Sequence, residues 1–389
     1  MPDVVASVEV FTLTQTRETP YLGERLPGEE VNAKGYLVRK DNRTVYPTFD
    51  RSVLVRIETR QGVIGWGETY GIVAPGAVAA IINDLLLDFT IGRDPTDPSA
   101  IYDDLYDLMR VRGYTGGFYV DALAAIDIAL WDIAGKQASK PVAEMLGGVV
   151  HGQIPAYVSG LPEVTLDARC ALAVSWQAKG YSDFKFASPM ANQGVEAELR
   201  ALRAALGSDA RIAADLHWNH TADEAISLIT AMEPHGLWFA EAPVRTEGIG
   251  ALEQVSKSVE TPVAVGEEWR TDHDMRQRVE RCRIAIVQPE MGHKGITNFM
   301  RIGKMAAAHG IDVLPHATIG AGIFLAASLQ ASSALEAVIG HEFQHSIFEP
   351  NRWLLTGDMD CAAGAYSPPT GPGLGVEPTR KALDLLQPI

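Results

Sequence analysis

The chain has 389 residues, 47% of them hydrophobic, and a formal net charge of −16. This length suggests about two or three domains or one barrel with an addition. The acidic balance argues against nucleic acid or an anionic membrane as the main partner. The three cysteines match neither a metal knuckle nor a disulfide framework, so we expect buried thiols in a reducing compartment. Since no stretch has the character of a signal peptide or a membrane span, we expect a cytoplasmic protein. The acidic balance favours a small-molecule partner, and we also expect a homo-oligomer.

The N-terminal part of the sequence mixes strand-like and helical segments. Two β-rich runs, "VASVEVFTL" and "KGYLVRK", precede a predicted hairpin over residues 52–68 that turns at "TRQG". Helical spacing follows at 76–89 and 98–112. This part is therefore predicted to be an α+β lid domain.

From residue 121 onward, short β-rich runs alternate with amphipathic segments. An open doubly wound sheet would show the same local pattern, but the number of strands favours a (β/α)₈ barrel. The predicted strands lie near 153–158, 182–187, 211–215, 237–241, 262–267, 283–288, 311–316 and 336–342.

Three acids follow the apolar runs of successive predicted strands. They are Asp215 in "IAADLHW", Glu241 in "FAEAP" and Glu267 in "AVGEEW". A structural ion pair would explain any one of them alone. In a barrel, however, the carboxyl ends of the strands converge on one face, and three converging carboxylates need a cation. Because the set contains only oxygen ligands, it favours Mg²⁺ over Zn²⁺ or Cu²⁺.

Two further strand-end residues are candidates for proton transfer. Lys185 ends the predicted second strand and His316 the seventh, which places them on opposite sides of the expected metal. The alternative is an ordinary lysine and a core histidine with satisfied hydrogen bonds. Glu290, at the end of the sixth strand, could accept a hydrogen bond from His316 or form a salt bridge with Lys294.

Several motifs resemble those of one known family. The run "AAIDIALWDIAGKQASKPVAEMLGG", the hairpin ending "GVIGWGE", and the "FAEAP" and "VGEE" positions resemble the mandelate racemase-like branch of the mandelate racemase and muconate lactonizing enzyme family, in the enolase superfamily. The resemblance implies a capping domain over 1–130 plus about 355–389, and a (β/α)₇β barrel over 131–354. It also implies Mg²⁺ held by Asp215, Glu241 and Glu267.

The same resemblance implies a reaction, in which the proton α to a substrate carboxylate is removed and the metal stabilises the resulting enediolate. His316 matches the strand-seven histidine of this branch, and Glu342 matches the acid that hydrogen-bonds the substrate carboxylate. The sequence departs from the family twice. The Lys-x-Lys of strand two is Lys185-Phe186-Ala187, and the Asp that pairs with the histidine is Glu290.

The missing second lysine favours dehydration of a sugar acid, an aldonate or aldarate, to a 2-keto-3-deoxy acid. The alternatives are an epimerase or racemase, or a lactone cycloisomerase. A metal-dependent hydrolase would carry a His-x-His pair on strand one, where the sequence reads "IPAYVSG". A binding protein would have no use for both Lys185 and His316. The lid segment contains five arginines: Arg17, Arg25, Arg39, Arg43 and Arg51. Arginines bind carboxylates well, and we take Arg25 and Arg43 as candidates to bind the substrate carboxylate. The alternative is that they belong to a solvated surface loop.

Overall fold

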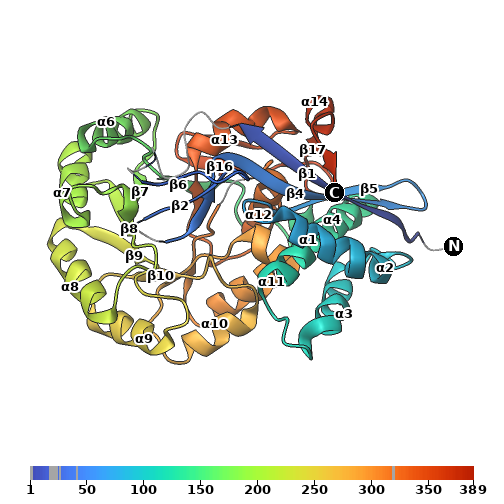
Figure 1. The fold of residues 1–389 in the computed structure, drawn as a ribbon, viewed down its shortest axis with the longest axis horizontal. Coiled ribbons are helices and arrows are strands. Elements are labelled where there is room, and N and C mark those ends of the chain that lie inside the picture. Colours follow the sequence, from blue (N-terminus) through green and yellow to red (C-terminus); the bar gives the residue numbers. More distant parts are fainter. Residues whose placement is uncertain (1–2, 17–24, 26–27, 41–42, 318–319) are drawn as a thin grey trace.

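The computed structural model describes residues 3–16, 25, 28–40, 43–317 and 320–389. Within that part of the chain, eight parallel strands form a ring with helices outside it (Figure 1). The strands are β6 (Ile154–Ser159), β7 (Asp183–Ala187), β8 (Arg211–Asp215), β9 (Leu237–Glu241), β10 (Val263–Val265), β11 (Ile286–Val287), β12 (Asp312–Val313) and β13 (His341–Phe343).

The ring closes between its first and last strands. Strand β13 pairs with β6 in parallel register, with Glu342 opposite Tyr157. Between β12 and β13 the ring is joined by an isolated parallel bridge from Val313 to Val338. This closure confirms the predicted barrel and rules out the open doubly wound sheet.

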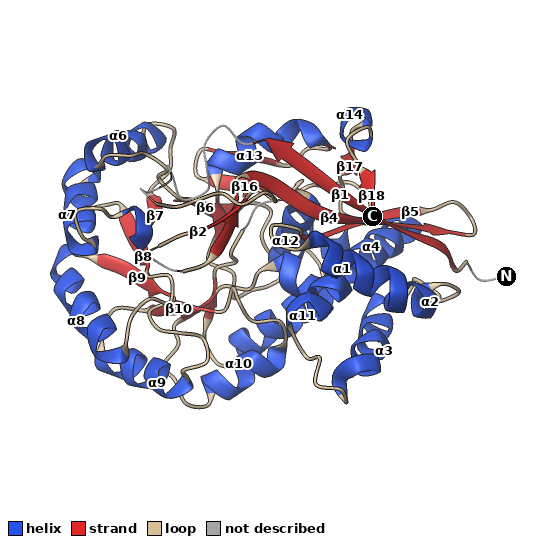
Figure 2. Cartoon of the chain, in the orientation of Figure 1, coloured by secondary structure: helices blue, strands red, loops and turns tan. Residues whose placement is uncertain are grey.

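Seven helices connect the eight strands, so that the described barrel has the (β/α)₇β form that the family resemblance implied. Figure 2 shows these helices outside the strands. Thr221 caps the start of α8 and forms a capping box with Glu224. The helices are α6 (Leu166–Gln177), α7 (Val195–Leu206), α8 (Ala222–Met232), α9 (Ile249–Ser258), α10 (Asp272–Val279), α11 (Met291–Ala308) and α12 (Ile323–Ser333).

The last strand begins later than predicted. The sequence predicted a strand over 336–342, but the structure places β13 at His341–Phe343. Residues after α12 turn instead, because Ala334 donates to the carbonyl of Ala331 and Val338 to that of Leu335. Leu335 and Val338 of this turn are buried, so that the turn has apolar residues at positions where the sequence predicted a strand.

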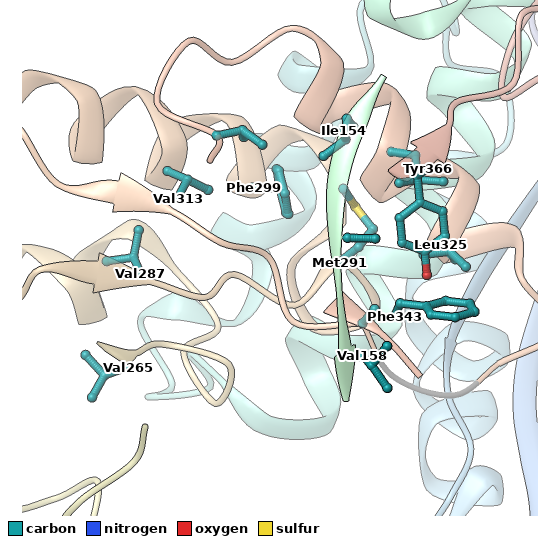
Figure 3. Packing of buried hydrophobic residues seen from close by; sticks show 14 of the residues in the cluster. Ile154, Val158, Val265, Val287, Met291, Phe299, Val313, Leu325, Phe343 and Tyr366 are labelled. Carbon is teal, nitrogen blue, oxygen red and sulfur yellow. The ribbon is translucent and has the colours of Figure 1, made fainter. Parts of the chain in front are cut away.

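Alternate residues of the strands face opposite sides of the ring. One set packs against the helices, as Figure 3 shows for Val265, Val287 and Val313 on neighbouring strands. The other set forms a smaller cluster that includes Ala213 and Phe239, each two residues before an acid of the predicted metal site. Because the side-chain period is two, Asp215 and Glu241 lie on the same side of the ring as this cluster.

The capping part is built around an antiparallel sheet of order β18-β1-β4-β5. Its helices are α1 (Pro75–Ile81), α2 (Leu87–Thr90), α3 (Pro98–Arg110) and α4 (Gly117–Ala138), with a π-helical segment at Ile82–Leu86 between the first two. The predicted hairpin is present and turns at Thr59–Gly62. The strands are β1 (Val5–Thr16), β4 (Phe49–Thr59), β5 (Ile64–Tyr70) and β18 (Gln387–Pro388).

The C-terminal segment contacts both parts of the molecule. Strand β18 pairs with β1, whereas β16 (Ala365–Ser367) pairs antiparallel with the barrel strand β6. The predicted boundary at residue 130 falls inside α4. The division into domains at 130 and 355 therefore stays a prediction.

Three buried acids on α4 tie this helix to other elements. Asp121 pairs with Arg270, Asp127 accepts hydrogen bonds from the backbone and hydroxyl of Thr297, and Asp132 accepts from the backbone of Trp66. Asp127 and Asp132 belong to the family-like run, which begins inside α4, whereas Asp121 precedes it. Among the residues that the structure describes, no helix combines the length and the apolar character needed to cross a bilayer.

Candidate active site

The three predicted metal ligands lie at the carboxyl ends of neighbouring barrel strands. Asp215 ends β8, Glu241 ends β9, and Glu267 follows β10 by two residues. Ligand atoms of Glu241, Glu267 and His316 lie within 4.8 Å of one another, a grouping able to hold a metal ion. Asp215 stands outside this group, with its Oδ2 3.0 Å from the Nε2 of His217.

The site carries more buried negative charge than positive charge. Burial raises the pKa of Asp215, of Glu241 and, well above its usual value, of Glu267. Close by lie two further carboxylates, Glu290 and Glu342. In the described part of the chain, Lys185 and His316 are the cationic groups that pair with these acids. A divalent cation held by oxygen ligands would relieve this excess, so the residues present fit Mg²⁺.

Lys185 lies behind the acids and bridges two of them. Its Nζ donates to both carboxylate oxygens of Glu241, at 2.7 and 2.8 Å, and lies 3.1 Å from Oε1 of Glu342. Although burial opposes protonation, these carboxylates raise the pKa of Lys185 well above its usual value. Gln288 also donates to Glu241, at 2.6 Å. These contacts favour the protonated form of Lys185, and its part in proton transfer stays a prediction.

His316 and Glu290 lie side by side. An isolated parallel bridge joins their backbones, and Nδ1 of His316 lies 2.8 Å from Oε2 of Glu290. Lys294 instead donates to the backbone carbonyls of Glu267 and Glu290. The structure thus brings together the histidine and the acid that the sequence placed on adjacent strands.

The other nitrogen of His316 points to the acidic group. Nε2 lies 3.2 Å from Glu267 and 3.5 Å from Glu342. Burial alone would lower the pKa of His316, but the carboxylates of Glu267, Glu342 and Glu290 raise it to about 10.

Glu342 is fully buried at the end of the last barrel strand. It accepts a hydrogen bond from the backbone of Ala317 at 2.8 Å and interacts with Ser159. Burial would raise its pKa, but His316 and Lys185 lower it to about 2. Its role in binding the substrate carboxylate stays a prediction.

A cavity of about 190 Å³ opens above these residues. Barrel residues form one side of it, among them Asp215, Glu267 and His316, whereas Lys185 is absent from the described lining. The capping part supplies the facing wall through β3 (Val45–Pro47), β4 and β5. The lining residues are Thr44, Tyr46, Pro47, Phe49, Asp50, Tyr70, Ile72, Asp215, His217, Trp218, Glu267, His293 and His316.

Two cavity histidines were missed by sequence reasoning. His217 follows Asp215 by two residues, in "DLH", but it lies in the turn after β8 with a φ of 51°, so the strand period could not predict its direction. Burial lowers its pKa to about 4, and its Nδ1 is buried without a hydrogen-bond partner in the described part of the chain. His293, near the start of α11, carried no comparable spacing signal.

The predicted lid arginines occupy different environments. Arg25 and Arg43 are exposed and are not part of the described cavity lining, and Arg17 lies outside the described residues. Arg39 forms a buried ion pair with Glu29, and Arg51 packs over the ring of Phe49. Binding of substrate by Arg25 and Arg43 stays a prediction.

Comparison with known proteins agrees with this architecture. Residues 44–147 match the family "Mandelate racemase / muconate lactonizing enzyme, N-terminal domain", and residues 168–382 match "Enolase C-terminal domain-like". A D-galactarolactone cycloisomerase of Agrobacterium fabrum is 32% identical over 86% of this chain and 91% of its own length. A D-galactonate dehydratase of Ralstonia nicotianae is also 32% identical, over 86% of this chain and 90% of its own.

A solved structure is more similar still. A candidate isomerase from Sinorhizobium meliloti is 69% identical, covers 99% of this chain and 100% of its own, and superposes with a TM-score of 0.99. The two family matches agree with the ring of strands and with the acids at its mouth. The chain belongs to the enolase superfamily, with an N-terminal domain of the mandelate racemase and muconate lactonizing enzyme type.

Proposed function

We propose that this protein is a magnesium-dependent dehydratase of a sugar acid, which removes the α-proton and expels the β-hydroxyl to give a 2-keto-3-deoxy acid. The observation that carries the proposal is the acidic group at the base of the cavity, next to the His316–Glu290 pair. Relatives named for acting on galactonate and galactarolactone support a sugar acid as the substrate class.

Asp215, Glu241 and Glu267 would hold Mg²⁺. When bound, the ion supplies positive charge that stabilises the substrate carboxylate as its α-proton leaves. Lys185, fixed between Glu241 and Glu342, adds a second positive charge on the protein side of the site. We therefore expect Lys185 to be required for activity even though it lies behind the cavity wall.

We assign α-proton removal to His316. Without a metal the carboxylates hold it protonated; Mg²⁺ bound to Glu267 would offset the largest of these charges and leave Nε2 able to accept a proton. His316 lines the cavity, and Glu290 fixes one nitrogen, so that Nε2 is the nitrogen directed to the reacting groups. The departing hydroxyl needs a proton, and His316 can return to it the proton that it has taken up, so that water leaves and the imidazole is neutral again.

A second candidate is a lactone cycloisomerase, because a relative with that activity is as similar as the dehydratase. The two reactions share removal of the α-proton. They differ in the bond that breaks, since dehydration releases water whereas ring opening of a lactone releases nothing.

A substrate panel tests the proposal. The protein is incubated with Mg²⁺ and a set of aldonic acids, aldaric acids and their lactones, and 2-keto acids are trapped with semicarbazide. Mass spectrometry then separates loss of water, which supports the dehydratase, from an unchanged mass with a lactone, which supports the cycloisomerase. Deuterium uptake from solvent without a keto acid would identify an epimerase or racemase.

Variants connect the activity to the site. We expect chelation, Lys185→Ala and His316→Asn each to abolish product formation, with circular dichroism unchanged. The control is His273→Asn, since His273 is exposed. Full activity of Lys185→Ala and His316→Asn would contradict the assigned roles. The cytoplasmic location and the homo-oligomeric state stay predictions.

A further inference from the structure

His293 belongs to the wall of the cavity and has no part in the proton transfers proposed above. It lies at the start of α11 and lines the cavity together with Tyr70 of the capping part. The two rings are stacked, with centroids 3.9 Å apart and planes inclined by 10°. The imidazole is therefore held in one plane by a contact between the barrel and the capping sheet.

A hydrogen bond fixes which nitrogen of His293 carries its hydrogen. Nδ1 lies 2.8 Å from Oδ1 of Asp121, and Nε of Arg270 donates to the same oxygen at 2.8 Å. Burial opposes ionisation of Asp121, but His293 and Arg270 lower its pKa. An ionised carboxylate can only accept, so Nδ1 must be the donor.

The second nitrogen of His293 is then an acceptor. Burial lowers the pKa of His293 to about 4, so that the ring is neutral near pH 7 and Nε2 carries a lone pair. Nε2 makes no hydrogen bond to any residue in the described part of the chain. A group that lines a cavity and can only accept selects a ligand with a hydroxyl over one with a carboxylate at that position.

We propose that His293 is a specificity-determining residue that accepts a hydrogen bond from one hydroxyl of the sugar acid. The proposal rests on the proposed function and extends it to the recognition of the substrate. Asp121 and Arg270 are the positioning residues, because they hold the tautomer that makes Nε2 the acceptor.

The tautomer can be measured without any substrate. Long-range ¹⁵N–¹H correlation spectra of the full protein at pH 7, assigned with His293→Phe, report which ring nitrogen is protonated. We expect a protonated Nδ1 and a bare Nε2 for His293 in the wild type, and loss of this preference in Asp121→Ala. A protonated Nε2 in the wild type would overturn the proposal.

Specificity is measured with the sugar acid that the wild type converts best and with its analogues that each lack one hydroxyl. For one analogue we expect kcat/KM to fall by at least about tenfold in the wild type, because a polar site is left unpaired. His293→Phe should keep the stacking on Tyr70. In this variant the ratio of kcat/KM for the full substrate to kcat/KM for that analogue should be close to one. His293→Gln, which restores an acceptor, should recover part of the preference.

The matched control is His273→Phe, at an exposed histidine, which should leave every ratio unchanged. Undiminished discrimination by a folded and active His293→Phe would overturn the inference and leave the proposed function intact. Inactivity of the wild type on the whole panel would overturn the proposed function, and this inference with it.

Discussion

At the scale of single residues, Glu290 performs two tasks with its two oxygens. Oε1 accepts a hydrogen bond from the backbone of Gly292 at the start of α11, and Oε2 holds His316. The side chain is thereby fixed at both ends before it orients the imidazole. This double attachment explains how a glutamate can stand where the family usually has the shorter aspartate.

We predict that Glu290→Gln lowers kcat by about 10²-fold or more with little change in thermal stability, because an amide can no longer favour one tautomer of His316. Steady-state kinetics on the substrate found by the panel measures the effect. Glu290→Asp retains the charge and should keep more activity than the amide variant. Equal activity of Glu290→Gln and the control Glu280→Gln, at an exposed position, would contradict the orienting role.

A bound cation should reduce the repulsion among the buried carboxylates and thereby raise the free energy of unfolding. We predict that Mg²⁺ stabilises the wild type against thermal unfolding, by about 2.7 kcal/mol at a hundred times its Kd. Asp215→Asn should lose most of this gain, whereas Asp209→Asn, at an exposed site, should keep it. Differential scanning calorimetry with and without Mg²⁺ makes the measurement, and an unshifted wild type would argue against the site.

At the scale of elements, α4 is held by buried acids rather than by apolar contacts alone. Asp127 reaches α11 through Thr297, at 2.9 Å to the backbone nitrogen and 2.6 Å to the hydroxyl. Burial raises the pKa of Asp127 to about 7. The contact between these two helices is therefore sensitive to pH.

The sign of that sensitivity follows from linkage. Because the folded state holds the proton of Asp127 more tightly than the unfolded chain does, its contribution to stability is present at low pH and is lost as the pH rises from about 4 to about 7. We predict that, from pH 5 to pH 8, the free energy of unfolding of the wild type falls by at least about 1 kcal/mol more than that of Asp127→Asn. Urea unfolding at both values tests this, and a constant difference would contradict the raised pKa.

At the scale of the whole molecule, Glu68 joins the two parts. This fully buried acid of β5 accepts hydrogen bonds from the backbone nitrogens of Ala321, Ile323 and Phe324, at the start of the barrel helix α12. The loop that it holds follows directly after His316. The capping sheet thus supports the segment that carries a candidate catalytic group.

We predict that Glu68→Ala lowers the free energy of unfolding by about 3 kcal/mol, because it leaves buried backbone donors without a partner. It should also reduce activity, since the loop after His316 loses its anchor. Denaturant unfolding and kinetics measure the two effects. The control Glu144→Ala removes an exposed acid, and an equal effect of the two variants would contradict the bridging role.

The sequence predicted the barrel and its acids because both depend on local periodicity. The spacing of apolar runs placed the strand ends, and parallel closure brings strand ends together whatever lies between them. Side-chain partners could not be predicted in this way. The contact of Lys185 with both Glu241 and Glu342, and the pairing of His293 with Asp121, join residues from distant segments whose proximity exists only in three dimensions.

Both parts of the chain supply residues to the wall of the cavity. The acids and His316 come from the barrel, whereas Thr44, Tyr46 and Phe49 come from β3, the residue before it and the start of β4 in the capping part. We expect that replacement of this covering segment by that of a relative would change which substrate is preferred and leave the barrel residues of the site in place. A new substrate preference within the family would then need substitutions only in the segment that covers the barrel mouth.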